Sequence, residues 1–257
     1  MLPFIYIFGI KISMYGLLIV LGVAMGSAVA VFFPSKKGVP KQDVIFAICY
    51  AGIGAILGAK ILYLIVTIPQ LLNYKEQIVF SWELVYELIA YGFVFYGGLI
   101  GGVLFVSIYA LNYNLHFFDL IEILVPVVPL IHSIGRLGCF SAGCCYGKPM
   151  APPFGVQFHP ESVAPKNITL FPIQLLESVL NLILFIVIFV YSRKDRRSGQ
   201  ILGFYFIGYG IIRFILEYFR YDVVRGIFAG LSVSQWISIL LFPIGLYFLR
   251  GMKLNKV

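Results

Sequence analysis

The chain contains seven apolar stretches of about 20 residues, separated by charges, prolines and glycine clusters. An α-helix of that length matches the hydrocarbon thickness of a lipid bilayer, and a helix satisfies its backbone polar groups internally. We therefore predict transmembrane helices at residues 13–33, 44–67, 84–111, 117–134, 172–192, 201–218 and 233–249.

Composition supports this class of protein. Hydrophobic residues make up 61% of the 257 residues and charged residues 12%, and the mean hydropathy is +0.97. We predict an all-α integral membrane protein that forms a single polytopic domain over residues 1–257. The N-terminus lacks a basic region and a small-residue cleavage site, so we expect the first helix to be retained.

The net charge of +8 does not indicate nucleic-acid binding. The Lys and Arg residues lie in short clusters beside apolar spans, where topology and contacts with membrane lipids explain them. With the N-terminus outside, ten of the 19 cations fall in the inner segments. The positive-inside rule thus predicts an outer N-terminus and a cytoplasmic C-terminus. The inner cations are Lys36, Lys37, Lys41, Arg193, Lys194, Arg196, Arg197, Arg250, Lys253 and Lys256.

The segment HSIGRLGCFSAGCCYGKP, residues 132–149, places an arginine and three cysteines directly after an apolar run. We interpret it as a glycine-punctuated turn, with Arg136 between Gly135 and Gly138. An arginine at the membrane is costly unless it meets a carboxylate, a carbonyl or an anionic ligand. Arg136 is therefore a candidate for binding negative charge.

The segment from about residue 133 to 171 is too long for a simple connection. Five prolines restrict its backbone, and Phe154, Val156 and Phe158 alternate with other residues as in a short strand. We predict a small outer head or lid over a site that is reached from the lipid.

A second charged group lies in RFILEYFR. Arg213, Glu217 and Arg220 are spaced i, i+4 and i+7, which predicts one helical face and pairing of Arg213 with Glu217. Glu217 could take part in chemistry or could only neutralise Arg213, and Arg220 could be an interfacial residue that reaches toward the headgroups.

Several motifs together resemble the prolipoprotein diacylglyceryl transferase family over most of the chain. GRLGCFSAGCCYG is followed by LFPIQLLES and GYGIIRFILEYFR, and is preceded by MYG, GAKILY and YGGLIGG in the same order as in that family. The resemblance implies seven spans, an outward-facing site in a bacterial cell membrane, phosphatidylglycerol as lipid donor and the cysteine of a preprolipoprotein as acceptor. It implies no cofactor.

The resemblance also implies site residues. Arg136 and Arg213 match positions that bind the lipid phosphate, a task that suits a planar, permanently charged guanidinium. Catalytic candidates are Arg136, Arg213, Glu217, Tyr96 and Cys139. Substrate-binding candidates are Lys60, Tyr15, Gly97, Gly98, Gly135, Gly138, Cys144, Tyr146, Gln174 and Arg220.

The chain departs from the family pattern at polar positions. Cys139 stands where the family has Asn, Cys144 where it has Glu, and Tyr96 where it usually has His. Lys60 and Lys148 each replace an Arg. Lys60 could hold the lipid phosphate, or it could pair with Glu87 or extend to the headgroups. His132 and the segment's cysteines are further candidates for activating the acceptor thiol.

The cysteines allow other interpretations. They could pack among glycines, a thiol could act as a base beside Arg136, or Cys139 could form a disulfide with Cys144. A metal site is not expected, because adjacent cysteines rarely share one tetrahedral ion and no CxxC pair is present.

Three functional hypotheses follow. The first is a membrane transferase that moves the diacylglyceryl group of phosphatidylglycerol to a lipobox cysteine and releases glycerol phosphate. The second is a divergent paralogue that uses a phospholipid donor and another acceptor. The third is a small transporter, although no inverted repeat is visible.

Overall fold

The computed structural model describes residues 2–73, 82, 86, 88, 92–221 and 227–251, and its chain forms two compact units. Unit 1 comprises Met1–Gly38 and Ile121–Val257, and unit 2 comprises Val39–Leu120.

The helices of the described residues are α1 (Met14–Phe32), α2 (Lys41–Asn73), α4 (Phe95–Asn112), α5 (Phe117–Leu124), α6 (Val128–Ala142), α7 (Ile173–Tyr191), α8 (Gln200–Glu217) and α9 (Val233–Leu249), with a 3-10 turn η1 (Val125–Val127) between α5 and α6. The described residues also form three short antiparallel strand pairs: β1 (Phe4–Ile7) with β2 (Ile10–Ser13), β3 (Val156–Gln157) with β4 (Thr169–Leu170), and β5 (Ile227–Phe228) with β6 (Leu231–Ser232).

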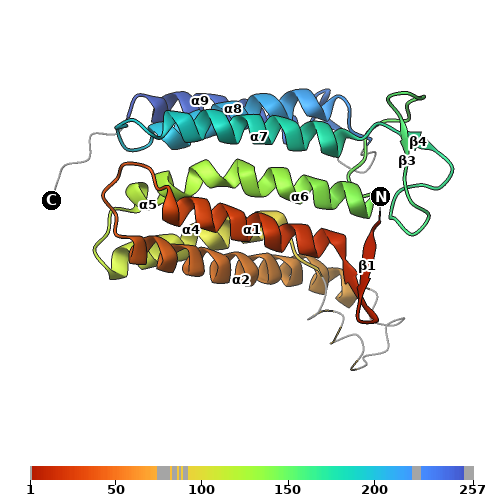
Figure 1. Ribbon diagram of the computed structural model, residues 1–257, viewed down its shortest axis with the longest axis horizontal. Coiled ribbons are helices and arrows are strands. Elements are labelled where there is room, and N and C mark those ends of the chain that lie inside the picture. Colours follow the sequence, from red (N-terminus) through yellow and green to blue (C-terminus); the bar gives the residue numbers. More distant parts are fainter. Residues whose placement is uncertain are drawn as a thin grey trace. The chain divides into compact units, whose positions relative to one another are not determined.

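The helices of unit 1 pack in a chain of neighbours. Helix α1 packs on α6, α6 on α7, α7 on α8, and α8 on α9. Figure 1 shows α7, α8 and α9 together beside α6 and α1, with β3 and β4 beyond the end of α6. Residues far apart in sequence, near the ends of α6 and α8 and the start of α7, therefore lie at the same end of this unit.

Glycines bring helices α2 and α4 of unit 2 into close contact. A side chain on Gly54 would strike the backbone of Gly101, and one on Gly58 would strike the backbone of Gly97. Small residues allow such close approach of helices in membranes, where van der Waals packing replaces the hydrophobic effect between them. The glycine pattern of the two helices thus determines their contact.

The surface of unit 1 is apolar and part of its interior is polar. Helix α7 buries Gln174, Glu177, Ser178 and Asn181, which lie on one helical face. Its exposed side chains include Val179, Leu182, Ile183, Ile186, Val187 and Val190. A helix that directs large apolar groups outward and polar groups inward is suited to lipid rather than water.

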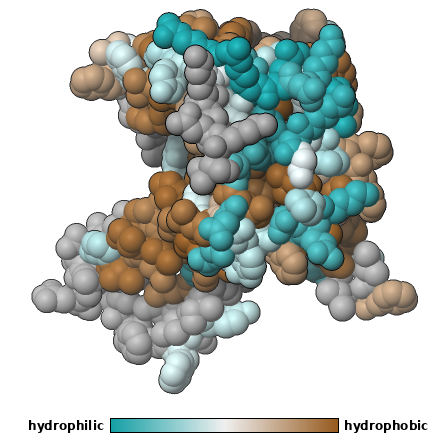
Figure 2. Space-filling view, turned by 90° about the vertical axis from the view of Figure 1, so that its left-hand side faces the viewer, coloured by the Kyte–Doolittle hydropathy of each residue, from teal (hydrophilic) through white to brown (hydrophobic). Residues whose placement is uncertain are grey.

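Basic residues gather at the end of unit 1 that carries the α1–α2 and α7–α8 loops. Lys37 Nζ donates to the Arg196 carbonyl at 2.8 Å, and Arg193 Nη2 donates to the Phe33 carbonyl at 2.6 Å. Figure 2 views this end of the helices and shows hydrophilic residues over its upper part. Beneath them Lys37 forms a buried ion pair of 2.7 Å with Glu122, whose Oε1 accepts from the backbone N–H of Ile201 at the start of α8.

The predicted fold class is confirmed, with adjusted helix boundaries. Among the described residues, six helices are long and apolar enough to cross a membrane, and α9, at 17 residues, is slightly shorter. Helix α4, the counterpart of the third predicted helix, begins at Phe95, since Gly92 has φ +77 and Val94 is extended; most of the predicted residues 84–91 lie outside the described residues. The second runs further than predicted, through Asn73.

The largest correction concerns the fourth helix. The prediction that it ends at residue 134 is wrong, because α6 continues to Ala142 and closes at Gly143 in the left-handed conformation. Arg136 and Cys139 therefore lie on a helix, not in a turn. The non-helical segment begins at Gly143 instead of residue 133 and includes the short β3–β4 pair, which contains the expected Val156.

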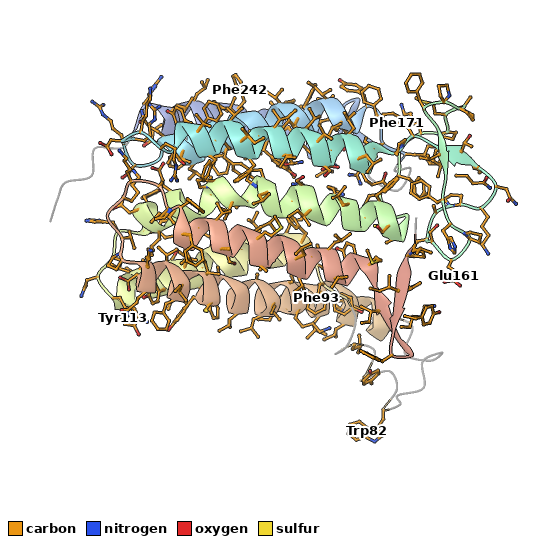
Figure 3. All side chains as sticks on the ribbon, in the orientation of Figure 1. Trp82, Phe93, Tyr113, Glu161, Phe171 and Phe242 are labelled. Carbon is orange, nitrogen blue, oxygen red and sulfur yellow. The ribbon has the colours of Figure 1, made fainter. Side chains whose placement is uncertain are left out.

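This segment returns to the start of α7 at Phe171, and Figure 3 labels Glu161 and Phe171 in it. Phe158, Ala164 and Leu170 form its small core, with Phe140 and Tyr146 packed against them. A β1–β2 hairpin before α1 was not predicted.

Candidate active site

Arg136 and Glu177 form the centre of a charged cluster in unit 1. Arg136 Nη2 lies 2.9 Å from Glu177 Oε1, and the two side chains are 15% and 2% exposed. Arg136 comes from α6 and Glu177 from the first turns of α7, which pack together. Arg136 thus has a carboxylate partner that offsets the free-energy cost of placing its charge within the membrane.

The second oxygen of Glu177 faces another arginine. Arg220 Nη1 lies 3.9 Å from Glu177 Oε2, and both side chains are 2% exposed. The prediction that Arg220 continues the helical face of Arg213 is wrong, because α8 ends at Glu217. The Arg220 backbone instead pairs with that of Gly147, after the cysteine segment, and the Arg220 side chain is buried beside Glu177.

Arg213 is held on α8 by two neighbours. Its Nη2 lies 2.6 Å from Glu217 Oε2, as the i, i+4 spacing predicts, and donates to Ser234 Oγ on α9 at 2.9 Å. Its other terminal nitrogen, Nη1, is buried and has no hydrogen-bond acceptor among the described residues. A buried guanidinium donor without an acceptor is costly, and an anion bound there would remove the cost.

His132 and Tyr209 connect the two arginines. Arg136 Nε donates to His132 Nε2 at 3.1 Å, and the His132 ring lies 5.7 Å from that of Tyr209, one turn before Arg213 on α8. Glu177 interacts electrostatically with both Arg136 and Arg213. The two arginines named from the sequence therefore belong to one cluster.

The cluster has an excess of positive charge. It contains three guanidiniums, from Arg136, Arg213 and Arg220, and two carboxylates, from Glu177 and Glu217, around a histidine that accepts a hydrogen bond as a neutral ring would. One positive charge remains, which equals in size the single negative charge of a phosphodiester.

Three cysteine sulfurs lie beside this cluster. The Sγ atoms of Cys139, Cys144 and Cys145 lie within 4.8 Å of one another, and Arg136 Nη1 lies 3.8 Å from Cys139 Sγ. All four cysteines of the chain are free thiols, including Cys49 on α2. Hydrogen bonds from the Cys139 and Cys144 thiols, aided by Arg136 and Arg220, lower the pKa of the Cys145 thiol, whereas the pKa of Cys144 is raised by its hydrogen bonds to Cys139 and Cys145.

Gln174 connects the start of α7 to the cysteine segment. Its Nε2 donates to the Cys144 carbonyl at 2.7 Å, while its buried Oε1 has no hydrogen-bond partner among the described residues. Tyr146 packs on the head core, and its carbonyl accepts from the Tyr221 amide at 3.3 Å. These two candidates position the backbone around the cluster.

Gly135 and Gly138 are helix contact points. A side chain on Gly135 would meet Ile19, and one on Gly138 would meet the backbone of Tyr15, both on α1. Tyr15 also lines a pocket of about 240 Å³ with Cys144. The other lining residues are Pro3, Phe4, Ser13, Ala142, Glu161 and Val163.

The candidates in unit 2 have their own contacts. Lys60 Nζ donates to the Gly92 carbonyl at 3.4 Å and lies 5.0 Å from the ring centres of Tyr63 and Phe93; its alternative partner, Glu87, lies outside the described residues. Tyr96 is half exposed and contacts the Phe95 ring. Gly97 and Gly98 pack on α2.

Glu177 lies in the LFPIQLLES motif but is not among the site residues predicted from the sequence. Ser234 and the placement of Tyr209 were not predicted either. The sequence does carry a signal for Glu177. It is a carboxylate three residues after Gln174 and four before Asn181, so these three polar residues share one face of an otherwise apolar helix.

Comparison with known proteins gives the family. A model described as prolipoprotein diacylglyceryl transferase matches residues 3–250. The chain belongs to the prolipoprotein diacylglyceryl transferase family.

Similar relatives cover nearly the whole chain. A phosphatidylglycerol–prolipoprotein diacylglyceryl transferase of Clostridium tetani is 39% identical over 251 residues, 97% of either chain. A second, numbered 2, from Clostridium perfringens is 32% identical over 97% of this chain and 95% of the relative. A relative from Bordetella avium, with the same name as the first, is 34% identical over 80% of this chain. Membership in this transferase family favours an enzyme over the transporter hypothesis.

Proposed function

We propose that this member of the prolipoprotein diacylglyceryl transferase family transfers the diacylglyceryl group of phosphatidylglycerol to the lipobox cysteine of a preprolipoprotein. The observation that carries the proposal is the buried, charge-excess cluster of Arg136 and Arg213, in which Arg213 Nη1 has no acceptor among the described residues. A phosphodiester supplies one negative charge and several acceptor oxygens.

The reaction explains why such a cluster is needed. The acceptor sulfur attacks the glycerol carbon that bears the phosphate ester, a C–S bond forms, and the C–O bond breaks to release glycerol phosphate. Negative charge grows on the leaving phosphate. Arg136 and Arg213 stabilise that charge, and fixed donors in a water-poor site are effective because they need no reorganisation.

Glu177 and Glu217 act as positioning residues in this proposal. Each holds one guanidinium through a short ion pair, 2.9 Å for Arg136 and 2.6 Å for Arg213. Ser234 supports Arg213 from α9. Holding the guanidiniums in place before the lipid arrives lowers the entropic cost of the transition state.

The thiol proton needs an acceptor, and His132 is the imidazole within the cluster. Its Nε2 accepts from Arg136 Nε at 3.1 Å. When Arg136 turns to the lipid phosphate, this lone pair becomes available for a proton. His132 thereby replaces the polar groups that the Cys139, Cys144 and Tyr96 substitutions remove.

We also propose the bacterial cell membrane as the location, with the N-terminus outside and the C-terminus cytoplasmic. The basic α1–α2 and α7–α8 loops lie at one end of unit 1, joined by the Lys37–Arg196 and Arg193–Phe33 contacts. The positive-inside rule assigns that end to the cytoplasm. The charged cluster, near the opposite helix ends, then lies toward the outer leaflet.

The test is direct. Purified protein is incubated with phosphatidylglycerol vesicles and a lipobox peptide, and mass spectrometry monitors the thioether-linked diacylglyceryl peptide. We expect this product with the wild type and its loss when the acceptor cysteine is replaced by serine. Consumption of phosphatidylglycerol without modification of the peptide would favour the paralogue with another acceptor.

A further inference from the structure

The cysteine cluster has a geometry that the proposed transfer reaction does not require. The sulfurs of Cys139, Cys144 and Cys145 lie within 4.8 Å of one another. Three sulfurs that bind one ion at about 2.3 Å in a trigonal arrangement are roughly 4 Å apart. The observed separation therefore needs only a small closure to enclose a metal ion.

The backbone explains how adjacent cysteines face the same point. Helix α6 ends after Ala142, and Gly143 and Cys145 both adopt the left-handed conformation, with φ +74 and +57. The Cys144 amide donates to the Cys139 carbonyl at 3.1 Å and closes the turn. Adjacent cysteines rarely share one ion, but the left-handed backbone at Gly143 and Cys145 brings Cys144 and Cys145 to the same side of this turn.

The turn is also fixed from outside. Gln174 Nε2, on α7, donates to the Cys144 carbonyl at 2.7 Å, and the Gly147 backbone pairs with that of Arg220. The three thiols are partly buried and remain accessible to an ion. The three thiols thus form a preorganised group, because contacts with Gln174 and Arg220 hold the backbone around them.

We propose that Cys139, Cys144 and Cys145 form a trigonal thiolate site for a soft monovalent cation, for which Cu(I) is the probe. Among the described residues, the group contains three sulfurs and no imidazole or carboxylate, a donor set that selects thiophilic ions. Binding releases the thiol protons and involves no change of oxidation state. The resulting complex carries a charge of −2, part of which is offset by Arg136, whose Nη1 lies 3.8 Å from Cys139 Sγ.

The experiment is a competition titration without oxygen. Full-length protein in detergent is mixed with Cu(I) held by a coloured chelator, and absorbance reports transfer of the ion. We expect one equivalent of Cu(I) per chain and a loss of affinity in Cys145→Ser that exceeds the roughly 10–100-fold cost of losing an outer-shell partner. Cys49→Ser, on α2, is the matched control and should bind as the wild type does.

Alkylation of the wild type gives an independent readout that does not depend on the folding of a variant. With one equivalent of Cu(I), mass spectrometry after maleimide treatment should find Cys49 modified and the three cluster cysteines protected. Equal modification of all four cysteines with and without Cu(I) overturns the proposal. Loss of binding in Cys49→Ser, or uptake of Zn(II) in preference to Cu(I), overturns it as well.

Discussion

Glu177 Oε1 lies 2.9 Å from Arg136 Nη2, while the other oxygen of the same carboxylate lies 3.9 Å from Arg220 Nη1. One buried carboxylate on α7 thus faces guanidiniums from two distant parts of the sequence. Substitutions at Glu177 and at Arg136 can distinguish the positioning role of the carboxylate from the lipid-binding role of the arginines.

Replacing Arg136 with alanine should reduce diacylglyceryl transfer by about 100-fold or more, because a fixed donor to the developing phosphate charge is lost. Transfer is measured as product per folded protein. Arg250→Ala, an exposed arginine at the basic end of unit 1, is the control and should retain activity. Arg136→Ala that transfers at the wild-type rate would refute the phosphate role.

Replacing Glu177 with glutamine should destabilise the protein and lower its activity together. Removal of one partner from a buried ion pair costs about 3–5 kcal/mol, since the remaining charges are uncompensated. Thermal unfolding in detergent measures the loss. The same change at Glu161, whose side chain is 55% exposed, should leave the unfolding temperature unchanged.

Breaking the Lys37–Glu122 pair at the basic end of unit 1 should lower stability without lowering the transfer rate. Its side chains are 7% and 0% exposed, so Lys37→Ala should lower stability to a similar extent. Because the pair lies away from the Arg136 cluster, the transfer rate per folded molecule should not change. A reduced rate in folded Lys37→Ala would show that buried charge in general, not the cluster, sustains activity.

Substitution of Gly58 with alanine should destabilise unit 2 by about 1–3 kcal/mol, because the added methyl group meets the Gly97 and Gly101 backbone and separates α2 from α4. Gly52→Ala on the same helix is the matched control, since nothing lies within 4 Å of its added carbon. There the helix propensity of alanine should preserve or raise stability. Equal unfolding temperatures for both variants would contradict the close glycine packing.

Most helices could be predicted from the sequence. The end of the fourth helix was predicted wrongly, because glycine occurs both in turns and where helices pack closely. The bounds of α9 match the prediction, because Ser232 and Gln235 form a capping box at its start. Gly135 and Gly138 suggested a turn, yet in the structure they let α1 approach a continuing helix. Only the packing partner distinguishes these two uses of glycine.

The rest of the site could not be predicted, because its geometry depends on contacts between residues far apart in sequence and on unusual backbone conformations. The Arg213–Glu217 pair follows from local spacing, but the inward position of Arg220 depends on a backbone bridge to Gly147, more than 70 residues earlier. The cysteines at positions 139, 144 and 145 converge through left-handed backbone at Gly143 and Cys145. Neither feature has a periodic signal in the sequence.

The most direct measurement is a double-mutant cycle on the transfer rate with Arg136→Lys, Arg213→Lys and the double variant, because lysine keeps the charge and loses the two-pronged donor. If both guanidiniums act on one phosphate, the double variant should lose much less than the product of the two single losses, as residues that act as a unit do. Losses that simply multiply would mean that Arg136 and Arg213 act independently, and would contradict a shared lipid phosphate.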